Sequence, residues 1–109
     1  MKTIALFGAG GHTKVIIDLI YNLDNYQIVG IYDDIKEGVF QNIPIIGKTD
    51  KIKSNCDEYI IGIGNDNIRE KIYNQYPNLP WAILIHPKSI VSQNAIINKG
   101  TVIFAGAVV

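Results

Sequence analysis

The hydrophobic residues after Pro87 recur every six positions, and this period constrains the fold of the chain more than any other feature of its sequence. Two aliphatic sets share the period: Ile90, Ile96, Val102 and Val108, and Val91, Ile97, Ile103 and Val109. Small residues follow the first three members of the second set by four positions, at Ala95, Thr101 and Ala107. Such a pattern is typical of a solenoid of short stacked strands, because only small side chains fit at its corners. We therefore predict hexapeptide repeats in residues 87–109.

The hexapeptide pattern reaches Val109 after about one coil, if a coil contains three hexads. A solenoid needs roughly three or more repeats before neighbouring coils bury each other's faces. We therefore expect the solenoid in this chain to be incomplete.

The start of the chain has a different pattern, that of a strand, a glycine turn and a helix. The apolar run 4–7 ends at a turn that contains Gly8, Gly10 and Gly11. Apolar residues then recur at helical spacing and predict an amphipathic helix over about 12–23. This succession is typical of the opening of a nucleotide-binding unit.

Strands continue to alternate with helices up to Pro87. Apolar runs predict strands at 27–32, 58–64 and 81–85. One further short strand is expected within 39–46. Because the strands are near-continuous apolar runs, we predict a parallel sheet that is covered on both faces.

A second helix is predicted between the last two of these strands. Asn67, with Glu70 three residues later, indicates a helix start of the capping-box kind, and Pro77 ends the helix. Residues 50–55 are expected to form a short helix or a turn.

Length and charge exclude several classes of protein. With 109 residues, 48% hydrophobic and 18% charged, the chain is long enough for one ordinary soluble domain. Its formal net charge is zero, so it has no overall basic field to attract nucleic acid or an anionic membrane. Cys56 has no cysteine partner, and the apolar run before Gly8 is too short for a signal peptide or a membrane span. We expect a cytoplasmic protein that binds neither nucleic acid nor membrane.

Four segments carry a resemblance to a known family: Phe7–His12, Tyr32–Asp34, Ile63–Arg69 and Ile85–Pro87. In this order they resemble the bacterial sugar-nucleotide acetyltransferases of the sialic acid O-acetyltransferase (NeuD) and UDP-amino-sugar N-acetyltransferase (PglD) types. The resemblance implies an α/β fold, with a small Rossmann-like parallel-sheet domain at residues 1–86. It implies that residues 87–109 form the first coil of a truncated left-handed β-helix.

The same resemblance implies an activity for the whole protein. Acetyl-CoA is the expected co-substrate, no metal is expected, and the acceptor is a UDP- or CMP-type sugar nucleotide or an amino sugar for surface glycan synthesis. Members of the family are similar to one another in forming homotrimers and in using a histidine as general base. That histidine is expected beyond Val109, so the 109-residue chain alone is expected to be inactive.

Two groups of residues are predicted to bind the nucleotide. Gly10, Gly11 and His12 begin the first helix, where backbone N–H groups and the positive end of the helix dipole suit a phosphate. Asp33 and Asp34 follow the glycine turn by about twenty residues, where a carboxylate can accept hydrogen bonds from ribose hydroxyls or from the N–H of a pyrimidine ring. The structural alternatives are a tight turn without a ligand and a solvated acidic turn.

A third group, Gly64 and Asn65, follows another strand and is expected at the same edge of the sheet. Its alternative role is helix entry alone, with Asn67 as the cap and Asn65 in a left-handed turn. His86 is interpreted as part of a structural joint, and the aromatic residues 73, 76 and 81 as core or interface residues.

Two other classes of protein remain open from the sequence. The glycine turn and the acidic pair also fit an NAD(P)-binding Rossmann domain of an oxidoreductase or redox sensor, although Thr13 replaces the third glycine of the dinucleotide fingerprint. Alternatively, the chain is a module that binds a sugar nucleotide without chemistry of its own.

Overall fold

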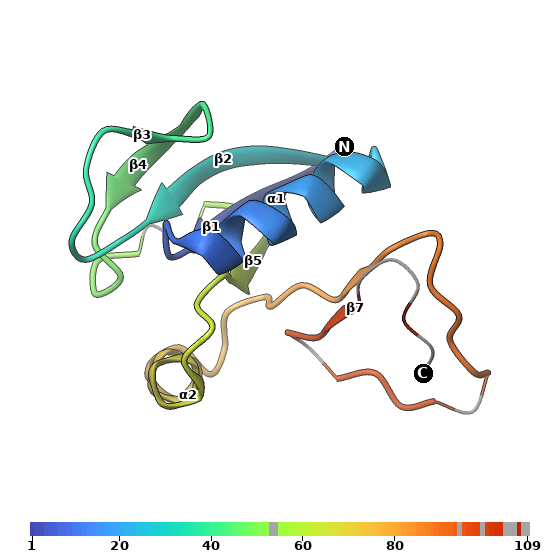
Figure 1. Cartoon of the computed structure of the whole chain (residues 1–109). Helices are drawn as coiled ribbons and strands as arrows, with labels where there is room; N and C mark the ends of the chain where they lie inside the picture. Colours follow the sequence, from blue (N-terminus) through green and yellow to red (C-terminus); the bar gives the residue numbers. More distant parts are fainter. Residues whose placement is uncertain (53–54, 94, 99, 104–106, 108–109) are drawn as a thin grey trace.

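The computed structural model describes residues 1–52, 55–93, 95–98, 100–103 and 107. Its elements are β1 (Lys2–Phe7), α1 (Gly11–Leu23), β2 (Tyr26–Tyr32), β3 (Val39–Phe40), β4 (Ile43–Gly47), β5 (Glu58–Ile61), α2 (Asp66–Gln75), β6 (Leu84–Ile85) and β7 (Val102–Ile103). Five strands form one sheet in the order β3-β4-β2-β1-β5, and β6 and β7 form a second, small sheet (Figure 1).

The predicted parallel sheet is confirmed. Strand β1 lies between β2 and β5 and pairs in parallel with both, and β2 pairs in parallel with β4. The single strand that was expected within 39–46 is instead a hairpin, because β3 pairs antiparallel with β4. Gln41 and Asn42, the two residues of its turn, have φ of 52° and 65°. Two successive left-handed residues suit a tight hairpin turn. The sequence gives no clear signal for this turn, because neither residue is glycine.

Both faces of the sheet are covered, as predicted. The side chains of β1 alternate, so Ile4 and Leu6 pack with the apolar side of α1, which lies across one face in Figure 1. Phe7 points to the other face, where it packs with Ile72 of α2 and with Trp81. The central strands therefore contribute to both core clusters.

The capping prediction for α2 was wrong by two residues. Asn65, not Asn67, is the N-cap, and its side-chain oxygen accepts a hydrogen bond from the backbone N–H of Ile68 at 3.0 Å. Asn65 has φ of −77° and ψ of 119°, an extended conformation rather than the left-handed turn that the alternative required. An N-cap must be extended so that its side chain can reach back to the first turn, and here the chain leaves β5 in that conformation.

A turn over residues 48–51 stands at the start of the predicted helix or turn at 50–55, with the N–H of Lys51 donating to the carbonyl of Lys48 at 3.2 Å. The remainder of that prediction includes Lys53 and Ser54, which lie outside the described residues.

The apolar run 81–85 divides between the two sheets. Trp81 forms a parallel bridge to Tyr59 of β5, whereas β6 pairs in parallel with β7. Val102 of β7 follows Leu84 of β6 by three periods of six residues, and the N–H of Leu84 donates to the carbonyl of Thr101 at 2.9 Å. The chain therefore returns to lie beside itself at the spacing of the hexapeptide pattern, although Val108 and Val109 lie outside the described residues.

Aromatic side chains join the main sheet to the returning chain. Trp81 donates its indole N–H to the carbonyl of Tyr76 at 3.1 Å and packs edge-on against Tyr73 at 4.8 Å between ring centroids. The Tyr73 hydroxyl reaches the carbonyl of Gly100 at 3.4 Å. The core or interface role predicted for these aromatic residues agrees with these contacts. His86 has a structural contact too, since its Nδ1 accepts from the N–H of Lys88 at 3.0 Å.

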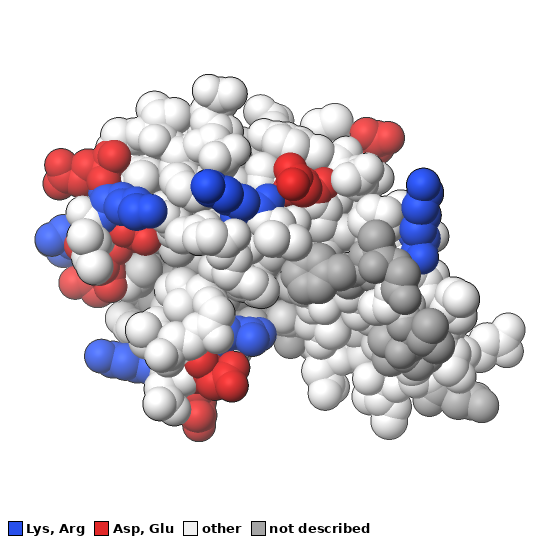
Figure 2. Space-filling model, viewed as in Figure 1, with Lys and Arg blue, Asp and Glu red and all other residues white. Residues whose placement is uncertain are grey.

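Charged side chains of both signs are interspersed on the face shown in Figure 2, in line with the balanced composition. Across the described part of the chain, neither helix has the length and apolar character that crossing a membrane requires.

Replacing Tyr76 by phenylalanine should destabilise the fold. The Tyr76 hydroxyl donates to the carbonyl of Thr49 at 2.7 Å, and Thr49 is only 8% exposed. Loss of the donor leaves a largely buried carbonyl without this partner, so we expect the free energy of unfolding to fall by about 1–2 kcal/mol. Urea denaturation measures the change. The matched control is Tyr21→Phe, because Tyr21 is 57% exposed and its substitution should have almost no effect.

Candidate functional site

The carboxyl ends of the parallel strands meet at one edge of the sheet and are tied together by backbone hydrogen bonds. The N–H of Gly8, after β1, donates to the carbonyl of Tyr32 at the end of β2 at 2.7 Å. The N–H of Gly62, after β5, donates to the carbonyl of Phe7 at 2.7 Å. In open α/β sheets, ligands bind in the crevice outside these strand ends.

A cavity of about 320 Å³ lies at this edge, and we call it the turn cavity. It is lined by Gly8, Ala9, Gly10, Gly11, His12, Asp33, Ile35, Lys36, Gly62, Ile63 and Gly64. The structure thus brings together five of the seven residues that the sequence predicted to bind nucleotide. Gly64 lies beside His12, because a Cβ added to Gly64 would be 4.0 Å from the Cβ of His12.

The glycines of the turn have two different roles. Gly8 has φ of 99°, and a Cβ added to it would lie 2.6 Å from a side-chain carbon of Ile63, so both the backbone conformation and the packing require glycine. At Gly10 and Gly11 an added Cβ would meet nothing within 4 Å. The fold itself therefore leaves room for side chains at these two positions.

The N-terminus of α1 opens into this space. Its N-cap is Gly10, which offers no side chain, and no side-chain hydrogen bond caps the helix. The first N–H groups of a helix lack partners within the helix and carry partial positive charge. An anion in the turn cavity can therefore approach these N–H groups directly.

Asp33 organises the loop opposite the glycine turn. One carboxylate oxygen accepts from the N–H of Ala9 at 2.9 Å, and the other from the N–H groups of Ile35 at 3.0 Å and Lys36 at 2.6 Å. Partial burial acts to raise the pKa of Asp33, but these three N–H donors and the charge of Lys36 outweigh it, so the pKa lies below its ordinary value. Asp33 is therefore an ionised carboxylate that fixes loop shape.

Asp34 makes its contacts on the other side of the loop. Its carboxylate accepts from the backbone N–H of Thr49 at 2.9 Å, and the Thr49 hydroxyl lies 2.9 Å from both carboxylate oxygens. The sequence predicted that both aspartates accept hydrogen bonds from a ligand, and the structure shows that each also holds a neighbouring loop. An ionised carboxylate offers about four acceptor sites, so ligand contacts are compatible with these bonds.

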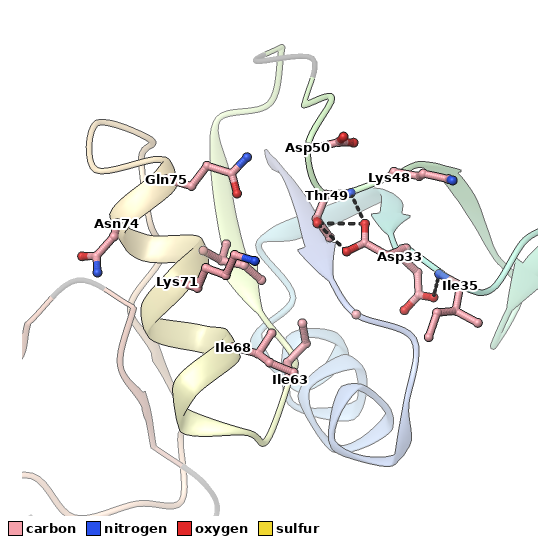
Figure 3. A pocket seen from close by; sticks show the side chains of 13 residues that line it. Asp33, Ile35, Lys48, Thr49, Asp50, Ile63, Ile68, Lys71, Asn74 and Gln75 are labelled. Carbon is pink, nitrogen blue, oxygen red and sulfur yellow. Dashed lines mark hydrogen bonds between the residues drawn. The ribbon is translucent and has the colours of Figure 1, made fainter.

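Asp34 lines a larger cavity of about 1040 Å³ between the 33–35 loop and α2, which we call the α2 cavity. Figure 3 shows its two walls, with Ile63, Ile68 and Lys71 on one side and Asp33, Thr49 and Lys48 on the other. Both cavities share Asp33, Ile35 and Ile63, so they are parts of one crevice.

Sequence reasoning missed four charged residues that line the crevice: Lys36, Lys48, Asp50 and Lys71. Among them, Lys36 lies at the turn cavity. The ammonium group of Lys36 donates to the carbonyl of Ala9 at 2.5 Å and lies 5.2 Å from the centre of the Phe40 ring. Lys36 therefore places a positive charge at the rim of the turn cavity. In the sequence, Lys36 follows the acidic pair without any signal of its own, and only its close approach to Ala9 in the structure distinguishes it.

Asn65 is the one predicted site residue that lines neither cavity. Its side chain is engaged in capping α2, which places it at the helix entry next to Gly64. Within the described residues, no group of three or more His, Cys, Asp or Glu side chains could hold a metal ion.

Comparison with known proteins agrees with the fold. The PglD N-terminal domain family matches residues 3–76. A curated relative, UDP-N-acetylbacillosamine N-acetyltransferase from Bacillus subtilis, is 33% identical over 114 aligned residues, which span 96% of this chain and 52% of that protein. Uncharacterized protein L142 of Acanthamoeba polyphaga mimivirus is 37% identical over 89% of this chain and 20% of its own length.

Among solved structures, the acetyltransferase domain of PglB from Neisseria gonorrhoeae in complex with acetyl coenzyme A is 34% identical and has a TM-score of 0.87. The match covers 98% of this chain and 55% of that domain. The chain thus spans about half the length of two of these relatives.

The fold defines an α/β domain similar to part of an acetyltransferase domain and of a UDP-N-acetylbacillosamine N-acetyltransferase. The chain belongs to the PglD N-terminal domain family. The family resemblance that the sequence motifs indicated is confirmed.

Replacing Asp33 by asparagine should lower stability in a pH-dependent way. An amide NH₂ group would face N–H donors, so we expect the free energy of unfolding at pH 7 to fall by about 1–2 kcal/mol. Because the folded state lowers the pKa, the contribution of Asp33 is present above the unfolded value of about 3.9 and is lost as pH falls through the folded value.

Urea unfolding of the wild type and the variant between pH 7 and pH 2.5 measures this contribution. The difference between the two proteins should shrink below about pH 4. Asp18→Asn, on the exposed side of α1, is the matched control and should follow the wild type at every pH. A stability difference for Asp33→Asn that did not change with pH would contradict the assignment.

Proposed function

We propose that the crevice at the carboxyl edge of the sheet binds a sugar nucleotide, with its diphosphate in the turn cavity. Gly10, Gly11 and His12 provide the helix N-terminus for the phosphates, and Lys36 provides charge at the rim. The observation that carries this proposal is the open space at Gly10 and Gly11, where glycine serves neither packing nor a left-handed backbone.

The remaining predicted residues surround the nucleoside and sugar. Asp33 and Asp34 retain acceptor sites for ribose hydroxyls or a pyrimidine N–H, and both face the crevice. Gly64 gives the ligand access to the backbone beside His12, and Asn65 positions Gly64 by capping α2. The base is proposed to be of the UDP or CMP type, and the name of the Bacillus subtilis relative supports the UDP type.

For the whole protein we propose acetyl-CoA-dependent N- or O-acetylation of a sugar nucleotide or amino sugar, in the synthesis of bacterial surface glycans. The relative from Bacillus subtilis and the acetyltransferase domain from Neisseria gonorrhoeae with acetyl coenzyme A support this reaction class. An amino or hydroxyl group of the sugar attacks the thioester carbonyl, a histidine acting as general base takes its proton, and CoA leaves as the thiol. We assign this base to none of the 109 residues.

We further propose that residues 1–86 form the nucleotide-sugar domain and that residues 87–109 begin a left-handed β-helix of a homotrimer. The parallel pairing of β6 with β7, three periods of six residues apart, supports a coil of three hexads. The N–H of Gly100 donates to the carbonyl of Ala82 at 2.8 Å, which seats the start of this coil on the first domain.

The NAD(P)-binding alternative has less support. Its two sequence features, the glycine turn and the acidic pair, do not distinguish it, since both lie within residues 3–76, which match the PglD N-terminal domain family. A ligand titration separates the two classes directly.

Thermal unfolding of the chain with UDP, CMP or NAD+ tests the proposed ligand class. A ligand that binds only the folded state stabilises it by RT ln(1 + [L]/Kd), about 2.7 kcal/mol at a hundredfold excess over Kd. We expect the melting temperature to rise with UDP or CMP and to be unchanged with NAD+. A rise with NAD+ alone would transfer the assignment to the oxidoreductase class.

Replacing Gly11 by alanine should move stability and affinity in opposite directions. Gly11 is the first residue of α1, so alanine should raise the free energy of unfolding by about 0.5–1 kcal/mol. The added methyl group occupies open space at the turn cavity, so the Kd for UDP or CMP should rise about tenfold, a loss of about 1.4 kcal/mol.

Calorimetric titration and urea unfolding measure the two effects of Gly11→Ala. Asn22→Ala, in the last turn of α1, is the matched control and should leave affinity unchanged. Undiminished affinity in Gly11→Ala would remove Gly11 from the site.

A further inference from the structure

Thr13 is the only polar side chain of α1 that the described structure buries completely, with 0% of its surface exposed. It stands in the first turn of the helix, at the position where the dinucleotide fingerprint has its third glycine. Its hydroxyl lies 2.7 Å from the carbonyl oxygen of Gly8 and 3.0 Å from that of Gly62. A hydroxyl has one hydrogen, which is shared between these two acceptors.

The contact with Gly8 is one of two hydrogen bonds that hold a single peptide group. The carbonyl of Gly8 and the N–H of Ala9 belong to the same peptide, and that N–H donates to the Asp33 carboxylate at 2.9 Å. Thr13 and Asp33 thus hold opposite ends of one peptide plane. The orientation of this plane determines where the following turn directs the N–H groups of Gly10 and Gly11.

The contact with Gly62 fixes the opposite rim of the crevice. A Cβ added to Gly62 would collide with the Thr13 hydroxyl and lie 3.2 Å from the Thr13 Cα, so α1 approaches the end of β5 closely. Ile63 follows Gly62, lines both cavities, and packs against Gly8. One buried hydroxyl therefore connects the turn after β1 with the rim after β5.

We propose that Thr13 is a positioning residue, whose hydroxyl sets the spacing and orientation of the glycine turn and the 62–64 rim for a nucleotide diphosphate. The inference rests on the proposed function, because it holds Thr13 responsible for the shape of that same binding site. Thr13 touches no ligand and acts through the peptide groups it holds. At the place where a third glycine would only permit close packing, this chain uses a hydroxyl to tie the two rims together.

The test compares two substitutions of Thr13 in the 109-residue chain. Thr13→Val keeps the shape but removes the hydroxyl, and Thr13→Ser keeps the hydroxyl. The probes are UDP and CMP, titrated calorimetrically at a temperature where urea unfolding shows each variant to be folded. Thr3→Val is the matched control, because the Thr3 hydroxyl bonds to Asp57, at the opposite end of β1 from the crevice.

We expect Thr13→Val to raise the Kd about tenfold, as for the loss of one well-placed hydrogen bond, and Thr13→Ser to restore it to within about twofold of wild type. Amide hydrogen exchange at Ala9 and Ile63 should accelerate in Thr13→Val and not in Thr13→Ser. If Thr13 served stability alone, Thr13→Val would have a lower free energy of unfolding than the wild type, but the Kd of the folded protein would be unchanged.

The outcomes separate this inference from the proposed function. If the wild-type chain binds UDP or CMP and Thr13→Val binds equally well, Thr13 has no positioning role and the proposed function stands. If Thr13→Ser fails to restore affinity, the hydroxyl is not the cause and the inference is again overturned. If the wild-type chain binds neither nucleotide, the proposed function fails, and this inference fails with it.

Discussion

Strand β1 is the constraint on which the rest of the structure depends. It pairs with β2 on one side and β5 on the other, and its residues Ile4 to Phe7 are completely buried. Its alternating side chains supply both cores, so neither α1 nor α2 can shift without disturbing the same strand. The crevice lies where this strand ends, at Gly8. Backbone hydrogen bonds join Gly8 to β2 and Gly62 to Phe7, so the sheet fixes the position of the crevice.

The acidic residues of the crevice hold its loops in place. Asp33 and Asp34 use their charge to hold backbone N–H groups of neighbouring loops, and these bonds keep the 33–36 loop close to the glycine turn and to Thr49. The proposed ligand therefore meets carboxylates whose positions are already set, which reduces the ordering that binding requires. Lys36 completes this arrangement by placing a positive charge at the rim.

A chain of contacts runs from the crevice to the second sheet. Asp34 holds Thr49, Thr49 accepts from Tyr76, and Tyr76 accepts from Trp81, which packs against Tyr73. Tyr73 in turn reaches Gly100, where a Cβ would collide with its hydroxyl. The crevice and the start of the hexapeptide segment are therefore placed relative to each other by aromatic packing and hydrogen bonds. This arrangement suits the proposed function, in which a ligand bound in the crevice is acetylated elsewhere in the whole protein.

The sequence by itself determined the class of fold, the main succession of strands and helices, and the hexapeptide period, because these follow from hydrophobic periods and glycine turns, which are local properties of the chain. Of the seven candidate site residues that it indicated, six line the crevice. Only the tertiary structure decided the β3–β4 hairpin, the cap at Asn65, the place of Lys36 and the role of Thr13. Hydrogen bonds join Ala9 to Asp33 across 24 positions and Thr13 to Gly62 across 49. No local sequence pattern predicts these hydrogen bonds, because they form only after the strands next to these residues have paired.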